Sequence, residues 1–318
     1  MAIEQRLLTA ASFLDNSPLA LEPSPDQALL QNDSTESGNW VTLRTALASS
    51  LPAPAVRTLA LVTPPAFYDR LRVLGLFSPD INPPQRNSYA PGAATVTLTA
   101  LTNAYRMLAN SGVLKPLGFR VGGVAGATQV MPAPVAAIVT DILADSNARW
   151  MKAGLDSAVT TSGFAAVKTG FSQDKRNNWS VGFSDQYTVG VWVGNVSGKS
   201  MRNVSDVNGA ARVWQALINK LNVAQPSRPP MLPGGVVVQT VRFEPPLEPP
   251  RRELFLPGTE QSVVTLAGDR SLAQIIGPTT LTLNTDIPAA WQRVRFYSRP
   301  LHRQWCALCL LIQFIQRI

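Results

Sequence analysis

The sequence predicts an α+β fold in which helices pack on an antiparallel sheet and a small β-rich unit follows. Three β-rich runs joined by polar turns, at 164–170, 178–185 and 187–195, predict an antiparallel meander. The next segment, 210–221, has Val213 and Leu217 on one stripe and is predicted to be an amphipathic helix. A proline-rich stretch and further short β-rich runs then indicate a linker and a second, all-β unit.

The part of the chain before the meander is predicted to be mostly helical. Residues 1–60 have helical spacing through Leu7, Leu8, Ala11 and Leu14, with a polar loop over 23–39. A helix over 40–47 is expected to end before Pro52 and Pro54, because proline has no backbone donor. Apolar spacing predicts further helices over 56–61, 67–74, 97–110 and 134–144.

The end of the chain is predicted to form a small antiparallel sandwich and a short tail. The β-rich runs lie at 236–243, 253–255, 262–266 and 279–283. The apolar run after Trp305 is too short to span a bilayer, and we expect it to be unstructured. The predicted organisation is therefore a domain over 1–222, a linker over 223–235, a β domain over 236–304 and a tail over 305–318.

Composition narrows the classes of function. The chain has 318 residues and is 45% hydrophobic, so it can bury a sizeable core. It also carries a formal charge of +8. No Lys/Arg run is interleaved with aromatics, so nucleic acid is not the expected partner. A nucleic-acid binder drawn by the positive charge stays an alternative, and binding to nucleic acid that falls steeply with salt would support it. An anionic wall polymer or a membrane surface fits the charge better. No signal peptide or membrane anchor is visible near Met1.

No metal or other cofactor is predicted. Cys306, Cys309 and His302 supply three potential ligands, whereas a structural zinc site needs four. His302 is the only histidine, so a Ser-His-Asp triad is not indicated either. The tryptophans of the meander and of the helix after it, Trp179, Trp192 and Trp214, are expected in the core.

The motif with the clearest chemistry is Lys168-Thr169-Gly170 on the first strand of the meander. A strand at a sheet edge offers backbone groups to an extended peptide, Lys168 adds a positive charge, and hydroxyls there can hold a substrate carboxylate. The backbone N–H of Phe171 would suit an oxyanion hole. On its own the triplet is a weak signal, because a lysine before Thr-Gly is usually a solvated strand end.

The triplet gains meaning from the segments around it. The segments Ala2–Ser12, Arg44–Leu51 and Leu101–Arg106, together with the meander, resemble the transpeptidase domain of class A penicillin-binding proteins, most closely the 1C type. Residues 236–304 resemble the small C-terminal domain of that type. The resemblance implies a penicillin-binding transpeptidase fold, similar to serine β-lactamases, that lacks its N-terminal part. Two strands of the family's five-stranded sheet precede the nucleophile, so we expect three strands and an open edge here.

The resemblance also implies an activity. In the family a serine attacks the D-Ala-D-Ala end of a peptidoglycan stem peptide, a lysine one helical turn later activates it, and β-lactams trap the same serine. Stem peptides and β-lactams are the implied partners. The family acts at the periplasmic face of the inner membrane, to which it is attached by segments outside this sequence. A chain with neither signal nor anchor leaves a cytoplasmic location open.

This sequence departs from the family pattern at each of the three site elements. The family's Ser-x-x-Lys lies just before the segment that begins at Ala2, and the one match here, Ser172–Lys175, follows the triplet into a predicted turn. The second element is Ser50-Leu-Pro52, where the family has Ser-x-Asn. In the third, Phe171 stands where the family has threonine, and Ser172 fits the pattern.

The predicted site follows from these matches. Ser50 and Lys168 are the predicted catalytic residues, and the predicted substrate-binding residues are Thr169, Gly170, Phe171 and Ser172. Without the activated serine we expect a D,D-transpeptidase domain with little or no acyl transfer. The alternative is a non-catalytic module that binds peptidoglycan or wall-synthesis proteins through the triplet's strand and the C-terminal domain.

Overall fold

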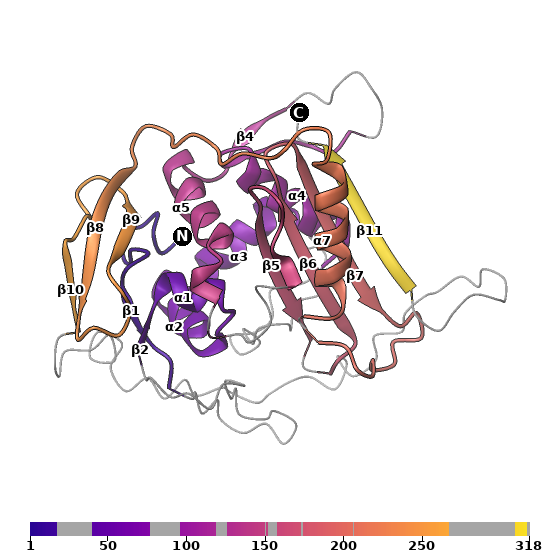
Figure 1. Ribbon diagram of the computed structural model, residues 1–318, viewed down its shortest axis with the longest axis horizontal. Coiled ribbons are helices and arrows are strands. Elements are labelled where there is room, and N and C mark those ends of the chain that lie inside the picture. The colour runs from indigo at the N-terminus through magenta and orange to yellow at the C-terminus, as the bar shows by residue number, and fades with distance from the viewer. Residues whose placement is uncertain are drawn as a thin grey trace.

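The structure is a computed structural model that describes residues 1–17, 40–76, 96–118, 126–149, 151, 158–172, 174–205, 207–266 and 309–316. In Figure 1 a sheet with helices on both faces lies at one end of the molecule, and a smaller sheet lies at the other. Helices α1, α2 and α5 lie between the two sheets. The α+β class expected from the sequence is confirmed.

The central sheet contains the predicted meander. Its strands are β5 (Ala166–Phe171), β6 (Asn177–Phe183) and β7 (Tyr187–Gly194), and both neighbouring pairs are antiparallel. Polar hairpin connections separate them, as the sequence indicated.

A fourth strand corrects two expectations. Strand β11 (Cys309–Gln316) pairs antiparallel with β7 along its whole length, in the order β11-β7-β6-β5 (Figure 1). The segment expected to be an unstructured tail is thus part of the sheet. Over the residues that the structure describes, the sheet has four strands where three were expected, and the edge of β7 that was expected to be open is covered. The physical reason is that β7 otherwise presents a row of unpaired N–H and C=O groups, which any extended segment within reach can satisfy.

Helices cover both faces of this sheet. Helix α7 (Ala210–Leu221) packs on one face, where Trp214 is fully buried and its indole N–H donates to Val189 O at 3.1 Å. The other face is covered by α4 (Leu98–Ala109) and α5 (Ala133–Ala144). Gly190 of β7 permits the approach of α4, because a Cβ there would overlap Thr102 Oγ1. All three helices lie within one residue of the predicted positions.

The N-terminal region differs from the helices that were expected. Residues 2–6 form turns, and β1 (Phe13–Asp15) pairs antiparallel with β2 (Trp40–Thr42). Helix α1 (Leu43–Ala48) starts only after Thr42, which caps it with its hydroxyl. An aromatic and two β-branched residues at 40–42 favour a strand, which explains why the helical prediction over 40–47 was wrong for its first part.

Two prolines start the next helices. Helix α2 (Pro52–Val62) and helix α3 (Pro64–Val73) both have proline in their first turn, where a missing N–H costs nothing. The predicted helical segments over 56–61 and 67–74 lie mostly inside them and are confirmed. Three short elements complete this region: β3 (Val113–Leu114), β4 (Thr128–Gln129) and the 3-10 turn η1 (Asn147–Arg149).

The small C-terminal sheet has the order β10-β8-β9. Its strands are β8 (Val237–Glu244), β9 (Arg251–Phe255) and β10 (Val263–Thr265). β8 and β9 are antiparallel as expected, but β10 is parallel to β8. Because β9 occupies one side of β8, a strand that reverses after β9 and pairs on the other side must run parallel to β8. The predicted strand at 279–283 lies outside the described residues.

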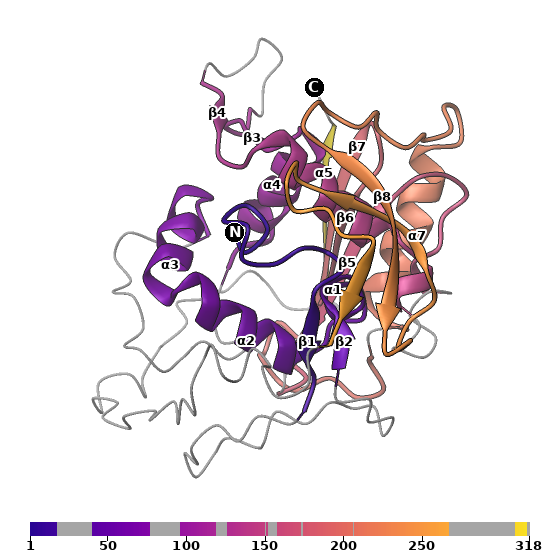
Figure 2. The same ribbon diagram turned by 90° about the vertical axis from the view of Figure 1, so that its left-hand side faces the viewer.

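The small sheet packs closely on the N-terminal part of the chain (Figure 2). Phe243 of β8 stacks edge-on against Phe13 of β1 with ring centroids 5.6 Å apart, and Leu254 of β9 joins the core around α1 and α5. The proposed boundaries at 222 and 236 stay predictions, since side chains from both parts share one core. No helix in the described part of the chain is long and apolar enough to cross a membrane.

Candidate functional site

The site begins at the C-terminal end of α1, where Ser50 adopts a left-handed backbone conformation. Its φ is 62°, and the N–H of Ser50 donates to Leu47 O at 3.3 Å while the N–H of Leu51 donates to Ala46 O at 2.9 Å. These two bonds form a Schellman motif, whose left-handed position is usually glycine. A serine there carries backbone strain in a fixed geometry.

Lys168 reaches Ser50 from the central sheet. Its ammonium donates a hydrogen bond to Ser50 Oγ and a second one, of 3.1 Å, to Thr169 O. Ser50 lies in the turn directly after α1, Lys168 lies on β5, and the two residues are 118 positions apart. The fold therefore brings together the second and third elements of the predicted site, with a hydroxyl and a positive charge in direct contact.

Strand alternation divides the triplet and its neighbours between the two faces of the sheet. Lys168 faces Ser50, whereas Phe171 packs against the apolar cluster around α7. Thr169 shares the face of Phe171, is 7% exposed, and its Oγ1 has no hydrogen-bond partner among the described residues. The substrate-binding roles of Thr169, Gly170 and Phe171 stay predictions.

Ser172 builds the turn that follows β5. Its Oγ donates to Asp174 Oδ1 at 2.5 Å and accepts from the N–H groups of Arg176 at 3.1 Å and Asn177 at 2.9 Å. Ser172 and Lys175 lie in the connection between β5 and β6, and Lys175 has a φ of 56°. The pair is therefore in a turn and not on a helix, as the sequence predicted.

Pro52 has a structural role in this geometry. It is the first residue of α2, directly after the Ser50-Leu51 turn. Proline suits that position because its φ is already helical. It supplies neither the side-chain amide that the family has there nor a backbone donor.

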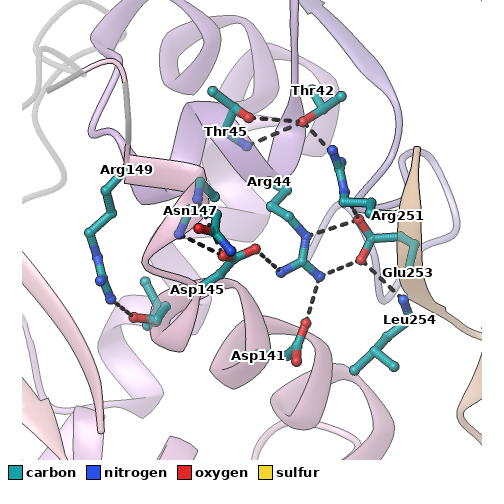
Figure 3. Close-up of polar contacts among 12 residues, drawn as sticks. Thr42, Arg44, Thr45, Asp141, Asp145, Asn147, Arg149, Arg251, Glu253 and Leu254 are labelled. Atoms are coloured by element: carbon teal, nitrogen blue, oxygen red, sulfur yellow. Dashed lines mark hydrogen bonds and ion pairs between the residues drawn. The ribbon is translucent and has the colours of Figure 1, made fainter. Parts of the chain in front are cut away.

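The other end of α1 holds a buried charge cluster that the sequence did not reveal. Arg44 forms ion pairs with Asp141, Asp145 and Glu253 (Figure 3). Burial alone would lower the pKa of Arg44, but its bonds to Glu253 and Asp141 raise it well above its ordinary range. The signal in the sequence was an arginine inside an otherwise uncharged, mostly apolar helix.

The predicted core positions of the three tryptophans have a mixed outcome. Trp214 is core, but Trp179 and Trp192 are only partly buried, with ring centroids 6.3 Å apart and the Trp192 indole donating to Asn177 Oδ1 at 3.0 Å. No group of three His, Cys, Asp or Glu residues suited to a metal occurs in the described part of the chain. His302 and Cys306 lie outside it.

Sequence comparison identifies relatives among proteins of one class. The chain is 28% identical over 235 residues to penicillin-binding protein 1C of Escherichia coli, covering 73% of this chain and 29% of that protein. It is 31% identical over 194 residues to penicillin-binding protein 1A of Aquifex aeolicus, covering 57% and 26% respectively. The chain thus spans less than a third of these relatives. No family model matches it.

Solved structures of the same class share the fold. Penicillin-binding protein 1A from Haemophilus influenzae superposes with a TM-score of 0.63 and 19% identity, over 80% of this chain and 45% of that one. PonA1 from Mycobacterium tuberculosis, in complex with penicillin V, gives 0.58 and 21%, over 73% and 68%. The fold is that of penicillin-binding transpeptidase domains. The sequence relatives support the penicillin-binding protein family.

Proposed function

We propose that this chain is part of a penicillin-binding protein of the 1C type and contributes the peptide-recognition side of a peptidoglycan D,D-transpeptidase site. The observation that carries the proposal is the hydrogen bond from Lys168 to Ser50, which joins two family motifs across 118 residues. The E. coli 1C relative, which covers 73% of the chain, supports the type.

The proposed role of each residue follows from its contact. Lys168 places a positive charge beside the Ser50 hydroxyl, which holds that hydroxyl ready to relay a proton. The same ammonium favours a substrate with a terminal carboxylate, as a stem peptide has. The described sheet gives β5 a strand neighbour on one side, β6, so an extended peptide has backbone groups available on the other.

We further propose that residues 1–318 alone do not form an acyl-enzyme. Acylation needs a serine beside an activating base, and the one Ser-x-x-Lys in this sequence lies in the β5–β6 connection with its hydroxyl bonded to Asp174. Ser50 does contact Lys168. Its hydroxyl lies at a strained helix end, however, and we assign it the role of a proton relay and not that of the nucleophile.

A complementation experiment tests this proposal. The segment that carries Ser-x-x-Lys in the E. coli 1C relative is fused before Met1. The extended and the unextended chain are each incubated with excess penicillin V, and their intact masses are measured under denaturing conditions. We expect an adduct on the extended chain alone. Lys168→Met should slow acylation of the extended chain by about 100-fold or more, the typical cost of one positioned group in an acyl-transfer site.

The control is Lys220→Met, which removes the same charge from an exposed position on α7, across the sheet from Ser50. An adduct on the chain without the added segment would show that residues 1–318 contain a nucleophile of their own. An extended chain that folds and stays unlabelled would contradict the transpeptidase proposal. It would favour the second candidate, a non-catalytic module that binds peptides along the free side of β5.

A further inference from the structure

We infer that the small C-terminal sheet positions Ser50 through helix α1, and that Glu248 and Glu253 are the positioning residues. The inference rests on the proposed function in that Ser50 and Lys168 are its site residues. It goes further by assigning the small sheet a role in the geometry of that site.

Helix α1 is too short to hold Ser50 in place by itself. It has six residues, with no acidic residue in its first turn and no basic residue in its last. Isolated helices of this length are not stable in water, because the cost of nucleation exceeds the gain from so few hydrogen bonds. Its position therefore depends on contacts from other elements.

Glu248, in the turn between β8 and β9, holds the start of α1. Its carboxylate accepts from the Thr42 N–H at 3.0 Å and from the Thr42 hydroxyl at 3.1 Å, and it is 8% exposed. Thr42 is the N-cap and its own hydroxyl accepts from the Thr45 N–H. Glu248, which also pairs with Arg251 Nη1 at 2.5 Å, thus ties the N-cap of α1 to the small sheet through two hydrogen bonds.

Glu253 of β9 fixes the orientation of α1. Its fully buried carboxylate accepts from Arg44 Nε at 2.9 Å and from Arg44 Nη2, while Arg44 also donates to Asp141 at 2.6 Å and Asp145 at 3.0 Å (Figure 3). A guanidinium is a rigid, planar fork, so partners on several sides determine its position in all directions. Rotation of α1 about its axis would break these bonds.

The same helix leads directly to Ser50. Its C-cap, Ser49, donates its hydroxyl to Ala148 O at 2.8 Å, and the Schellman bonds then set the backbone of Ser50 opposite Lys168. A rigid path of packed residues therefore runs from Glu253 through Arg44 to the contact between Ser50 and Lys168. Loosening α1 should move Ser50 relative to β5.

A double-mutant cycle on the full chain tests this path. The readout is the side-chain ¹³Cε–¹Hε NMR signal of Lys168. This signal is assigned as the one that is absent from the spectrum of Lys168→Arg. Glu253→Gln should shift the signal in the wild-type background. In the Ser50→Ala background the same substitution should shift it several-fold less, because the hydroxyl that transmits the effect is gone. A change that merely destabilised the protein would act alike in both backgrounds.

Glu244→Gln is the matched control, since Glu244 lies on β8 of the same sheet, is 56% exposed and pairs with Arg242 on its own strand. It should leave the Lys168 signal unchanged. If Glu253→Gln fails to fold, Glu248→Gln replaces it in the cycle. Equal shifts in both backgrounds, or no shift in folded Glu253→Gln or Glu248→Gln, would overturn the inference. No peptide or penicillin is used, so failure of the proposed function would not decide this test.

Discussion

At the scale of single residues, Ser50 combines an unfavourable backbone with a hydrogen-bonded hydroxyl. A left-handed conformation costs a non-glycine residue about 1–2 kcal/mol. Strain of this kind persists where the surrounding structure fixes it, and it is concentrated at functional sites. The hydroxyl that glycine would lack is the group that Lys168 contacts.

Substitution at Ser50 should separate the strain from the hydroxyl. We expect Ser50→Gly to be more stable than Ser50→Ala by about 1 kcal/mol, because both lose the Lys168 contact but only glycine relieves the left-handed backbone. Urea unfolding measures the difference. At the neighbouring Ser49, whose φ is −84°, the order should reverse, with glycine the less stable. An alanine variant at position 50 as stable as the glycine variant would contradict this account of the strain.

The buried ion pair should make stability depend on pH. Burial alone would raise the pKa of Glu253, but the hydrogen bonds and charge of Arg44 lower it overall. A lowered folded-state pKa means that Glu253 stabilises the fold above its unfolded pKa of about 4.3, and that this contribution is lost as the pH falls through the folded value. Wild-type stability should therefore fall more steeply below about pH 4.5 than that of Glu253→Gln, as measured by urea unfolding across pH.

At the scale of elements, local patterns predicted most of what lies around the site. The meander and the helices α4, α5 and α7 follow from periodicity and capping, and the structure confirms them. The pairing of β1 with β2 was missed, because the two short strands are separated by a long segment and their partners are not local. Strand β11 was missed for the same reason, since a lone apolar run does not reveal which edge it will pair with.

The pairing of β11 is open to a direct check. Deletion of residues 309–318 should expose the β7 amides that point away from β6, and hydrogen exchange at these positions in Tyr187–Gly194 should speed up by at least tenfold. Amides of β6, which has strands on both sides, serve as the internal control. Unchanged exchange along β7 would show that β11 does not cover this edge. The deleted chain should also associate more readily, because an open edge accepts other strands.

At the scale of the whole molecule, the helices that lie between the two sheets connect them through side-chain contacts. The contact of Ser50 with Lys168 agrees with the motif resemblance, which had placed both residues in one site. The ion pair of Arg44 with Glu253 was not predictable, because its residues are 209 positions apart and no sequence pattern relates the two. What sequence reasoning treated as a separate domain contributes buried charges that hold α1.

The most direct test of the proposed site is an NMR titration of the full chain with a stem pentapeptide ending in D-Ala-D-Ala. We predict saturable shifts at Ser50 and at Lys168–Gly170, at least tenfold weaker binding in Lys168→Met, and unchanged binding in Lys220→Met. Shifts that do not saturate, that map away from α1 and β5, or that are equal in both lysine variants would contradict a peptide-recognition site built on Ser50 and Lys168.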